Sequence, residues 1–425
     1  MNQALSAFDA AAILIVLSAI LGWINQRFLR LPGTVALTMM GAIASIIMVL
    51  LDQALPGSDL SGTVSRFLNG VDFHATLMDG MLSFLLFAGA LHVDIDQLRK
   101  GRRQIAILAT LGVITSTALV GLGFWGLTRS LGIEVPVIWC LVFGALISPT
   151  DPVAVMAVLK TARVPSGLQA TIAGESLFND GVGVVIFSIL LATAVSGQSF
   201  SLIGAGELFL VEAVGGAVFG FVIGWIGYRA MKSIDDYSVE VMISLAVVMG
   251  GYSLASALHI SGPVAMAVAG LLIGNRGVAE AMSDRTKDYL LKFWTLIDEV
   301  LNAVLFLLIG LEAIVVAQRW GLIGLGVLTI PLVLAARAVS VGVPLFAWRK
   351  LLPFRLTFPI MTWGGLRGGI SIALALSLPA SPIKDVLVAA TYMVVLFSVL
   401  VQGGTIKAVI QRATGRGEGR AEPHG

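Results

Sequence analysis

Long apolar stretches dominate this chain, and short polar segments separate them. A helix that spans a lipid bilayer needs about 20 mainly apolar residues. By this measure we predict thirteen membrane-spanning helices in an all-α, polytopic membrane protein. Their predicted ranges are 10–28, 34–52, 75–93, 105–128, 136–159, 166–196, 201–228, 238–258, 262–275, 294–316, 322–348, 358–378 and 384–406. Two amphipathic stretches, 53–74 and 276–293, are predicted to lie along the membrane interface as connectors.

The composition supports a chain that is mostly buried in lipid. Hydrophobic residues make up 57% of it and charged residues 12%, whereas soluble domains carry about 25% charged residues. A net charge of +2 is too small to indicate a nucleic-acid partner. The single cysteine, Cys140, excludes an intrachain disulfide and a multi-cysteine metal site, and the four histidines do not have metal-ligand spacing.

The lysines and arginines predict the orientation. With the N-terminus outside and thirteen alternating spans, 21 of the 27 basic residues lie in inside segments and 4 in outside segments. Cytoplasmic loops carry such an excess of positive charge. We therefore expect a multi-pass protein of the plasma membrane, the inner membrane of a bacterium, with its N-terminus outside and its C-terminus in the cytoplasm.

The fifth predicted span contains Pro149, Thr150, Asp151 and Pro152 at its middle. Two prolines three residues apart remove backbone donors and break a helix. An unwound segment inside a membrane is tolerated only where it is buried in protein or lines a cavity. A simple proline kink is the plainer alternative, but it does not explain Asp151, which costs about 2.5–3.5 kcal/mol at mid-span. We predict that carbonyls, the Thr150 hydroxyl and Asp151 bind a monovalent cation.

The sixth predicted span carries Glu175, Ser176, Asn179 and Asp180. On a helix, Ser176 and Asp180 lie about 40° apart, whereas Glu175 lies about 140° from Asp180. We predict that Ser176 and Asp180 face the site shared with Asp151, and that Glu175 faces elsewhere and needs its own counter-charge. The alternative is that these polar residues only pack helices together.

The twelfth predicted span contains four glycines around one arginine, Gly364-Gly365-Leu366-Arg367-Gly368-Gly369. Each glycine weakens a helix by about 1 kcal/mol relative to alanine. We therefore predict a second broken helix, with Arg367 as the partner of Glu175 in a structural ion pair. A close-packing glycine face is compatible with this interpretation.

The positions of the two breaks indicate an internal repeat. With the seventh span as a linker, spans one to six and eight to thirteen form two six-helix units of inverted topology. Each unit has its break in its fifth span. Matched broken helices in inverted halves are typical of transporters that bind substrate near the membrane midplane.

These segments together resemble the monovalent cation:proton antiporter-1 family, the NhaP and NHE type of Na⁺/H⁺ exchanger. The matching segments are 150–152, 174–180 and 364–369, with further similarity at 258–277, 301–312 and 336–341. The resemblance implies a homodimer and the antiporter fold with two unwound crossing helices. It implies a core domain (105–197 and 322–410) that moves against a dimerisation domain (10–93 and 201–316), within a membrane region of 1–410. Residues 411–425 read as a short disordered cytoplasmic tail.

The resemblance also implies residue roles. Asp151, Asp180, Ser176 and Thr150 match the family's cation ligands, and Glu175 and Arg367 match its structural ion pair. Arg337 matches a second family arginine with a supporting role. Asn179 next to Asp180 resembles the electroneutral members, which exchange one cation for one proton. No cofactor is expected beyond the transported Na⁺ and H⁺.

The mechanism follows from competition at one site. Burial and a second carboxylate both disfavour the ionised form of an aspartate, whereas a bound Na⁺ favours it. Asp151 and Asp180 can therefore hold a cation or protons, but hardly both, and elevator-type alternating access then couples the two fluxes. We expect a transporter and not an enzyme.

Three alternatives remain open at this point. A K⁺/H⁺ antiporter would use the same mechanism, since both cations bind oxygen ligands. A cation channel also uses broken helices, but no filter-like carbonyl repeat is visible. An intramembrane hydrolase using Ser176 lacks a mid-span histidine and a GxSxG turn.

Overall fold

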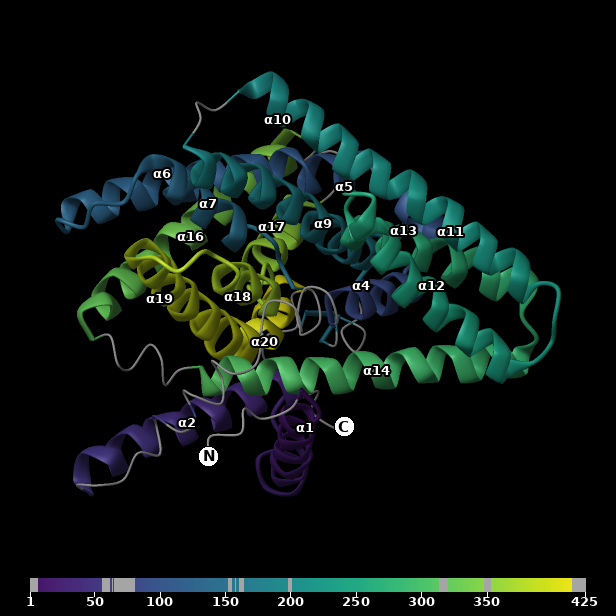
Figure 1. Ribbon diagram of the computed structural model, residues 1–425, viewed down its shortest axis with the longest axis horizontal. Coiled ribbons are helices and arrows are strands. Elements are labelled where there is room, and N and C mark those ends of the chain that lie inside the picture. The colour runs from purple at the N-terminus through teal and green to yellow at the C-terminus, as the bar shows by residue number, and fades with distance from the viewer. Residues whose placement is uncertain are drawn as a thin grey trace, which may run out of the picture.

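The computed structural model describes residues 7–55, 62, 64, 81–151, 155–156, 158–159, 164–197, 201–312, 320–347 and 353–414. Within these ranges every regular element is a helix (Figure 1). The helices at least 17 residues long are α1 (Ala7–Ile24), α2 (Gly33–Ala54), α6 (Leu111–Ser130), α9 (Ser166–Ser196), α11 (Gly215–Met231), α12 (Tyr237–Ala257), α14 (Asp284–Leu311) and α16 (Trp320–Ala347).

Shorter helices complete the described part of the fold. They are α4 (Leu82–Leu91), α5 (Ile95–Ala109), α7 (Val137–Ile147), α10 (Leu202–Phe209), α13 (Gly262–Leu272), α17 (Phe354–Trp363), α18 (Gly369–Leu376), α19 (Pro382–Phe397) and α20 (Gly404–Ala413). Four π-helical segments extend or join them: η1 (Asn25–Leu29), η3 (Leu210–Val214), η4 (Ile273–Ala281) and η5 (Ser398–Gly403).

The helices have the length and composition of membrane spans. Among the described residues, ten helical segments are long and apolar enough to cross a bilayer, and Leu82–Leu91 and Val137–Ile147 are shorter apolar helices. Large apolar side chains on α1 and α11 are exposed, including Trp23, Val218 and Phe221. The prediction of an all-α, multi-pass membrane protein is confirmed. Each of the thirteen predicted ranges contains described helical residues, but the number of crossings and the inverted repeat stay predictions.

Two predicted boundaries are wrong. Residues 284–293 do not form an interfacial connector, because they are the first ten residues of α14, which runs unbroken to Leu311. The Ser283 side chain caps this helix by accepting a hydrogen bond from the Thr286 amide. At the other end of the chain, α20 extends to Ala413 and so enters the range predicted as a disordered tail. Most of the other predicted connector, 53–74, lies outside the described residues.

The buried side chains pack into three hydrophobic clusters. One joins Phe87 and Leu91 of α4 to Trp294 of α14 and to residues of α11, α12 and α13. A second joins Leu108 and Ile172 to Val341 and Ile410, and so connects α5 and α9 with α16, α17 and α20. The largest cluster runs between these regions. In Figure 1, α11, α12 and α13 lie at one end of the bundle and α6, α7, α16 and α19 at the other, with α14 along one side.

Candidate functional site: two crossing helix breaks

The first predicted break lies at the end of α7. This helix ends at Ile147, and residues 148–150 are not helical. Pro149 cannot donate a backbone hydrogen bond, which accounts for the end of the helix here. The predicted unwinding before Asp151 is therefore present, whereas Pro152 lies outside the described residues.

The second predicted break lies between α17 and α18. Residues 364–368 separate the end of α17 at Trp363 from the start of α18 at Gly369. The amide of Asp151 donates a hydrogen bond of 2.8 Å to the carbonyl of Leu366, which forms an isolated antiparallel bridge. The two unwound segments therefore contact each other directly, although they are more than 200 residues apart in sequence.

Asn179 of α9 connects the first break to the acidic helix. Its side-chain amide donates to the Thr150 hydroxyl at 2.7 Å and to Glu175 Oε1 at 3.0 Å, while its oxygen accepts from the Thr150 amide at 3.3 Å. The hydroxyls of Thr150 and Ser176 are 3.2 Å apart. All four side chains are buried. The predicted grouping of Thr150, Ser176 and Asn179 is thus observed.

The two aspartates complete this group. Asp180 is buried and Asp151 is half-buried, and they lie close enough for their charges to interact. The chain at Gly368 passes against Asp151, because a Cβ atom at this glycine would lie 2.8 Å from Asp151 Oδ2. Carboxylate and hydroxyl oxygens are the ligands that hard cations prefer. The geometry offers such oxygens from both α9 and the first break.

The predicted ion pair between Glu175 and Arg367 is wrong. Arg337 of α16 binds both oxygens of Glu175, with Nη1 to Oε1 at 2.8 Å and Nη2 to Oε2 at 3.1 Å. Its Nε also donates to the Met361 carbonyl at 3.3 Å. The physical reason is geometric, since α16 places Arg337 beside Glu175 and a two-pronged contact suits a planar guanidinium.

Arg367 has a different role in the structure. Its Nη1 donates to the carbonyls of Ser148 and Pro149, the latter at 2.9 Å. These carbonyls have lost their helical partners at the first break. The positive charge of Arg367 also acts on the carboxylate of Asp180. Arg367 therefore joins the second break to the first and places a positive charge beside the aspartates.

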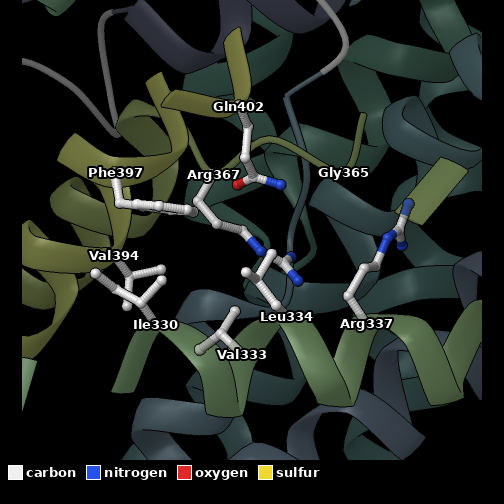
Figure 2. A pocket seen from close by; sticks show the side chains of 9 residues that line it. All are labelled: Ile330, Val333, Leu334, Arg337, Gly365, Arg367, Val394, Phe397 and Gln402. Atoms are coloured by element: carbon white, nitrogen blue, oxygen red, sulfur yellow. The ribbon is translucent and has the colours of Figure 1, made fainter. Parts of the chain in front are cut away.

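A small pocket lies on the arginine side of this assembly (Figure 2). Arg337, Arg367 and Gln402 contribute its polar lining, and side chains of α16 and α19 the apolar remainder. Neither aspartate lines it. The pocket therefore belongs to the scaffold behind the carboxylates and not to the candidate cation site.

The sequence matches a known protein family over most of its length. Residues 14–412 match the family described as "Sodium/hydrogen exchanger, transmembrane". The chain belongs to this family. Members of the sodium/hydrogen exchanger family are transporters and not enzymes, which excludes the hydrolase alternative for Ser176.

Relatives within the family cover almost the whole chain. The Na⁺/H⁺ antiporter NhaP of Pseudomonas aeruginosa is 44% identical over 409 residues, which is 95% of this chain and 96% of the relative. The Na⁺/H⁺ antiporter NhaH of Halobacillus aidingensis is 34% identical and covers 91% of this chain and 93% of its own. The fold is that of the sodium proton antiporter MjNhaP1 from Methanocaldococcus jannaschii, with a TM-score of 0.75 at 21% identity, covering 96% of this chain and 99% of the other.

Several polar residues that the sequence does not single out contact the two breaks. The Ser148 hydroxyl bonds to Ser116 at 3.0 Å and lies 3.4 Å from Thr117. Ser398 and Gln402 bond to the backbone of the second break. Each of these residues is a polar side chain within an apolar span, which the sequence shows. Hydroxyls and amides are too common in membrane spans, however, to indicate a role before their partners are known.

Proposed function

We propose that this chain exchanges Na⁺ for protons, one for one, by competition of the two ions for Asp180 and Asp151. One arrangement carries the proposal: Thr150, which precedes Asp151 in the unwound segment, lies 3.2 Å from Ser176, one helical turn before the buried Asp180 of α9. The names of the relatives, which are Na⁺/H⁺ antiporters, support Na⁺ as the cation.

The proposed cation ligands are the carboxylates of Asp151 and Asp180, the Ser176 hydroxyl and Thr150. Asn179 belongs to this site as the residue that holds Thr150, because its amide nitrogen already donates two hydrogen bonds. A cation bound among these oxygens favours ionised carboxylates, and loss of the cation favours their protonation. Each ion therefore displaces the other.

Exchange also requires that the empty site does not cross the membrane. Three carboxylates, from Asp151, Asp180 and Glu175, and two guanidiniums, from Arg337 and Arg367, leave one net negative charge. Moving a charge through the membrane interior is costly. One Na⁺ or one proton neutralises the group, so only a loaded site moves freely.

We further propose that the helices of 105–197 and 322–410 move together as the core domain against those of 10–93 and 201–316. The packing supports this division, because one hydrophobic cluster draws its buried members only from the first set and another only from the second. By the same family resemblance we propose a homodimer in the plasma membrane, with the N-terminus outside and the C-terminus in the cytoplasm.

Asp180→Asn in sealed vesicles tests the proposed function. We expect wild-type protein to release or take up protons when Na⁺ is added, and Asp180→Asn to show none, because an amide cannot exchange a proton for a cation. Glu207→Gln is the matched control, since it also replaces a carboxylate by an amide, but at an exposed acid of α10. A series of Na⁺, Li⁺ and K⁺ additions identifies the cation.

Competition between Na⁺ and protons for one site predicts a second result in the same vesicles. The apparent KM for Na⁺ should rise as the proton concentration rises, while the maximal rate changes little. Proton movement that persists in Asp180→Asn, or a KM that does not respond to pH, would contradict the proposed site.

A further inference from the structure

The second break leaves backbone groups without helical partners. The chain leaves α17 at Trp363 and enters α18 at Gly369, so the Trp363 carbonyl and the Arg367 amide have no partner within a helix. Arg367 is buried and Trp363 is half-buried, and a backbone group that is shielded from water without a partner costs about as much as a lost hydrogen bond. Other side chains must therefore satisfy these two groups.

Two residues of the π-helical segment η5 supply the missing partners. The Ser398 hydroxyl oxygen accepts from the Arg367 amide at 2.8 Å, and the Gln402 side-chain nitrogen donates to the Trp363 carbonyl at 2.9 Å. Ser398 in turn donates to Gln402 Oε1 at 2.7 Å. Both side chains are buried, and Figure 2 shows Gln402 beside Arg367.

The directions of these bonds are mutually determined. The Trp363 carbonyl can only accept, so the Gln402 nitrogen must face it and the Gln402 oxygen must face Ser398. That oxygen can only accept, so the Ser398 hydroxyl hydrogen points to Gln402. The Ser398 oxygen is then free to accept from the Arg367 amide. The three bonds therefore form one ordered network.

This network reaches Asp151 through a single peptide group. The Arg367 amide and the Leu366 carbonyl belong to the same planar unit, which cannot twist easily. Ser398 holds one side of the unit, and the carbonyl on the other side accepts from the Asp151 amide at 2.8 Å. Hydrogen bonds in such a chain also polarise one another. The position of Asp151 thus depends on Ser398 and Gln402 through this peptide group.

We propose that Ser398 and Gln402 are positioning residues of the transport site, which set the place of Asp151 through the peptide between Leu366 and Arg367. The inference rests on the proposed function and adds to it two residues of another helix. Both act on cation affinity and not on the overall fold. Because they form one network, removing either residue has the same effect as removing both.

The experiment compares Ser398→Ala, Gln402→Met and the double variant in the Na⁺-dependent vesicle assay. We expect each single variant to raise the apparent KM for Na⁺ about tenfold, the value of one lost buried hydrogen bond, with little change in maximal rate. The double variant should match the singles and not multiply them, and Ser398→Thr, which keeps the hydroxyl, should restore the KM. Thr405→Val is the control, because it loses the Thr405 bond to Trp363 Nε1 at 2.9 Å but leaves the backbone of the break unchanged.

Separate results bear on the two proposals. Absence of Na⁺-driven proton movement in the wild type would contradict the proposed function itself. An active wild type with an unchanged KM in the folded variants would overturn only the positioning role. Multiplied effects in the double variant, or loss of folded protein in both single variants, would assign these bonds to stability and also overturn it.

Discussion

Glu175 accepts three hydrogen bonds beside the breaks. Two guanidinium contacts from Arg337 and one amide contact from Asn179 satisfy its oxygens, and its side chain is only 1% exposed. A buried ion pair adds little stability when compared with apolar residues, but breaking it leaves a charge buried without its partner. Glu175 therefore acts as a fixed charge that joins α9 to α16.

Replacement of Glu175 by alanine should reduce the free energy of unfolding by about 3–5 kcal/mol, because Arg337 remains buried without its carboxylate. Thermal unfolding in detergent measures the loss. A double-mutant cycle then distinguishes the two arginines: Glu175 should couple to Arg337 and only weakly to Arg367. Stronger coupling to Arg367 would contradict the pairing seen in the structure.

At the scale of elements, the site depends on two helices that stop and restart. Proline at the first break lacks a backbone donor, and the glycines at the second weaken the helix. The backbone groups left without helical partners then bond to the other break or to side chains. Gly368 also lets the second break approach Asp151 more closely than any residue with a Cβ atom could. The glycine run therefore has a packing function besides weakening the helix.

The variant Gly368→Ala should weaken cation binding. The new Cβ would lie 2.8 Å from both Cβ and Oδ2 of Asp151, and such overpacking costs about 1–3 kcal/mol, which corresponds to about 5- to 150-fold in affinity. The apparent KM for Na⁺ in vesicles measures the change. Gly404→Ala is the control, since a Cβ there has no neighbour within 4 Å; equal KM values for both variants would argue against this close approach.

At the scale of the whole molecule, the buried charges define what can be carried. The carboxylates and guanidiniums around the breaks carry one net negative charge when no ion is bound. The loaded forms with one Na⁺ or one proton are both neutral. A transmembrane potential does work only on net charge, at about 2.3 kcal/mol per elementary charge per 100 mV. It should therefore act equally on the two loaded forms.

Transport by the wild type should consequently be insensitive to membrane potential. The initial rate of Na⁺-driven proton movement should be the same in vesicles clamped at zero and at about 100 mV of either sign. Reconstituted membranes should carry no net current during exchange. A clear current, or a rate that follows the clamped voltage, would contradict one-for-one exchange.

Much of the fold was predictable because a membrane simplifies the physics. Backbone groups in lipid must bond within the segment, so apolar length alone predicts helices, and the predicted ranges coincide with helical residues. The prediction fails at 284–293 because a polar helix surface does not by itself distinguish a connector from the first turns of a long helix. The capping residue Ser283 marks the true helix start, and Leu290 and Trp294 bury one face of its first turns.

The sequence by itself determined the membrane fold, the two helix breaks and the acids that lie beside them. These features depend on local chemistry: paired prolines and a run of glycines weaken a helix, and helical spacing places Ser176 and Asp180 on one stripe. Only the tertiary structure decided which arginine meets Glu175, which carbonyls Arg367 binds, and that Ser398 and Gln402 hold the second break. Those contacts join helices that are distant in sequence. They depend on how each helix is rotated about its axis when the helices pack, and no single segment determines that rotation.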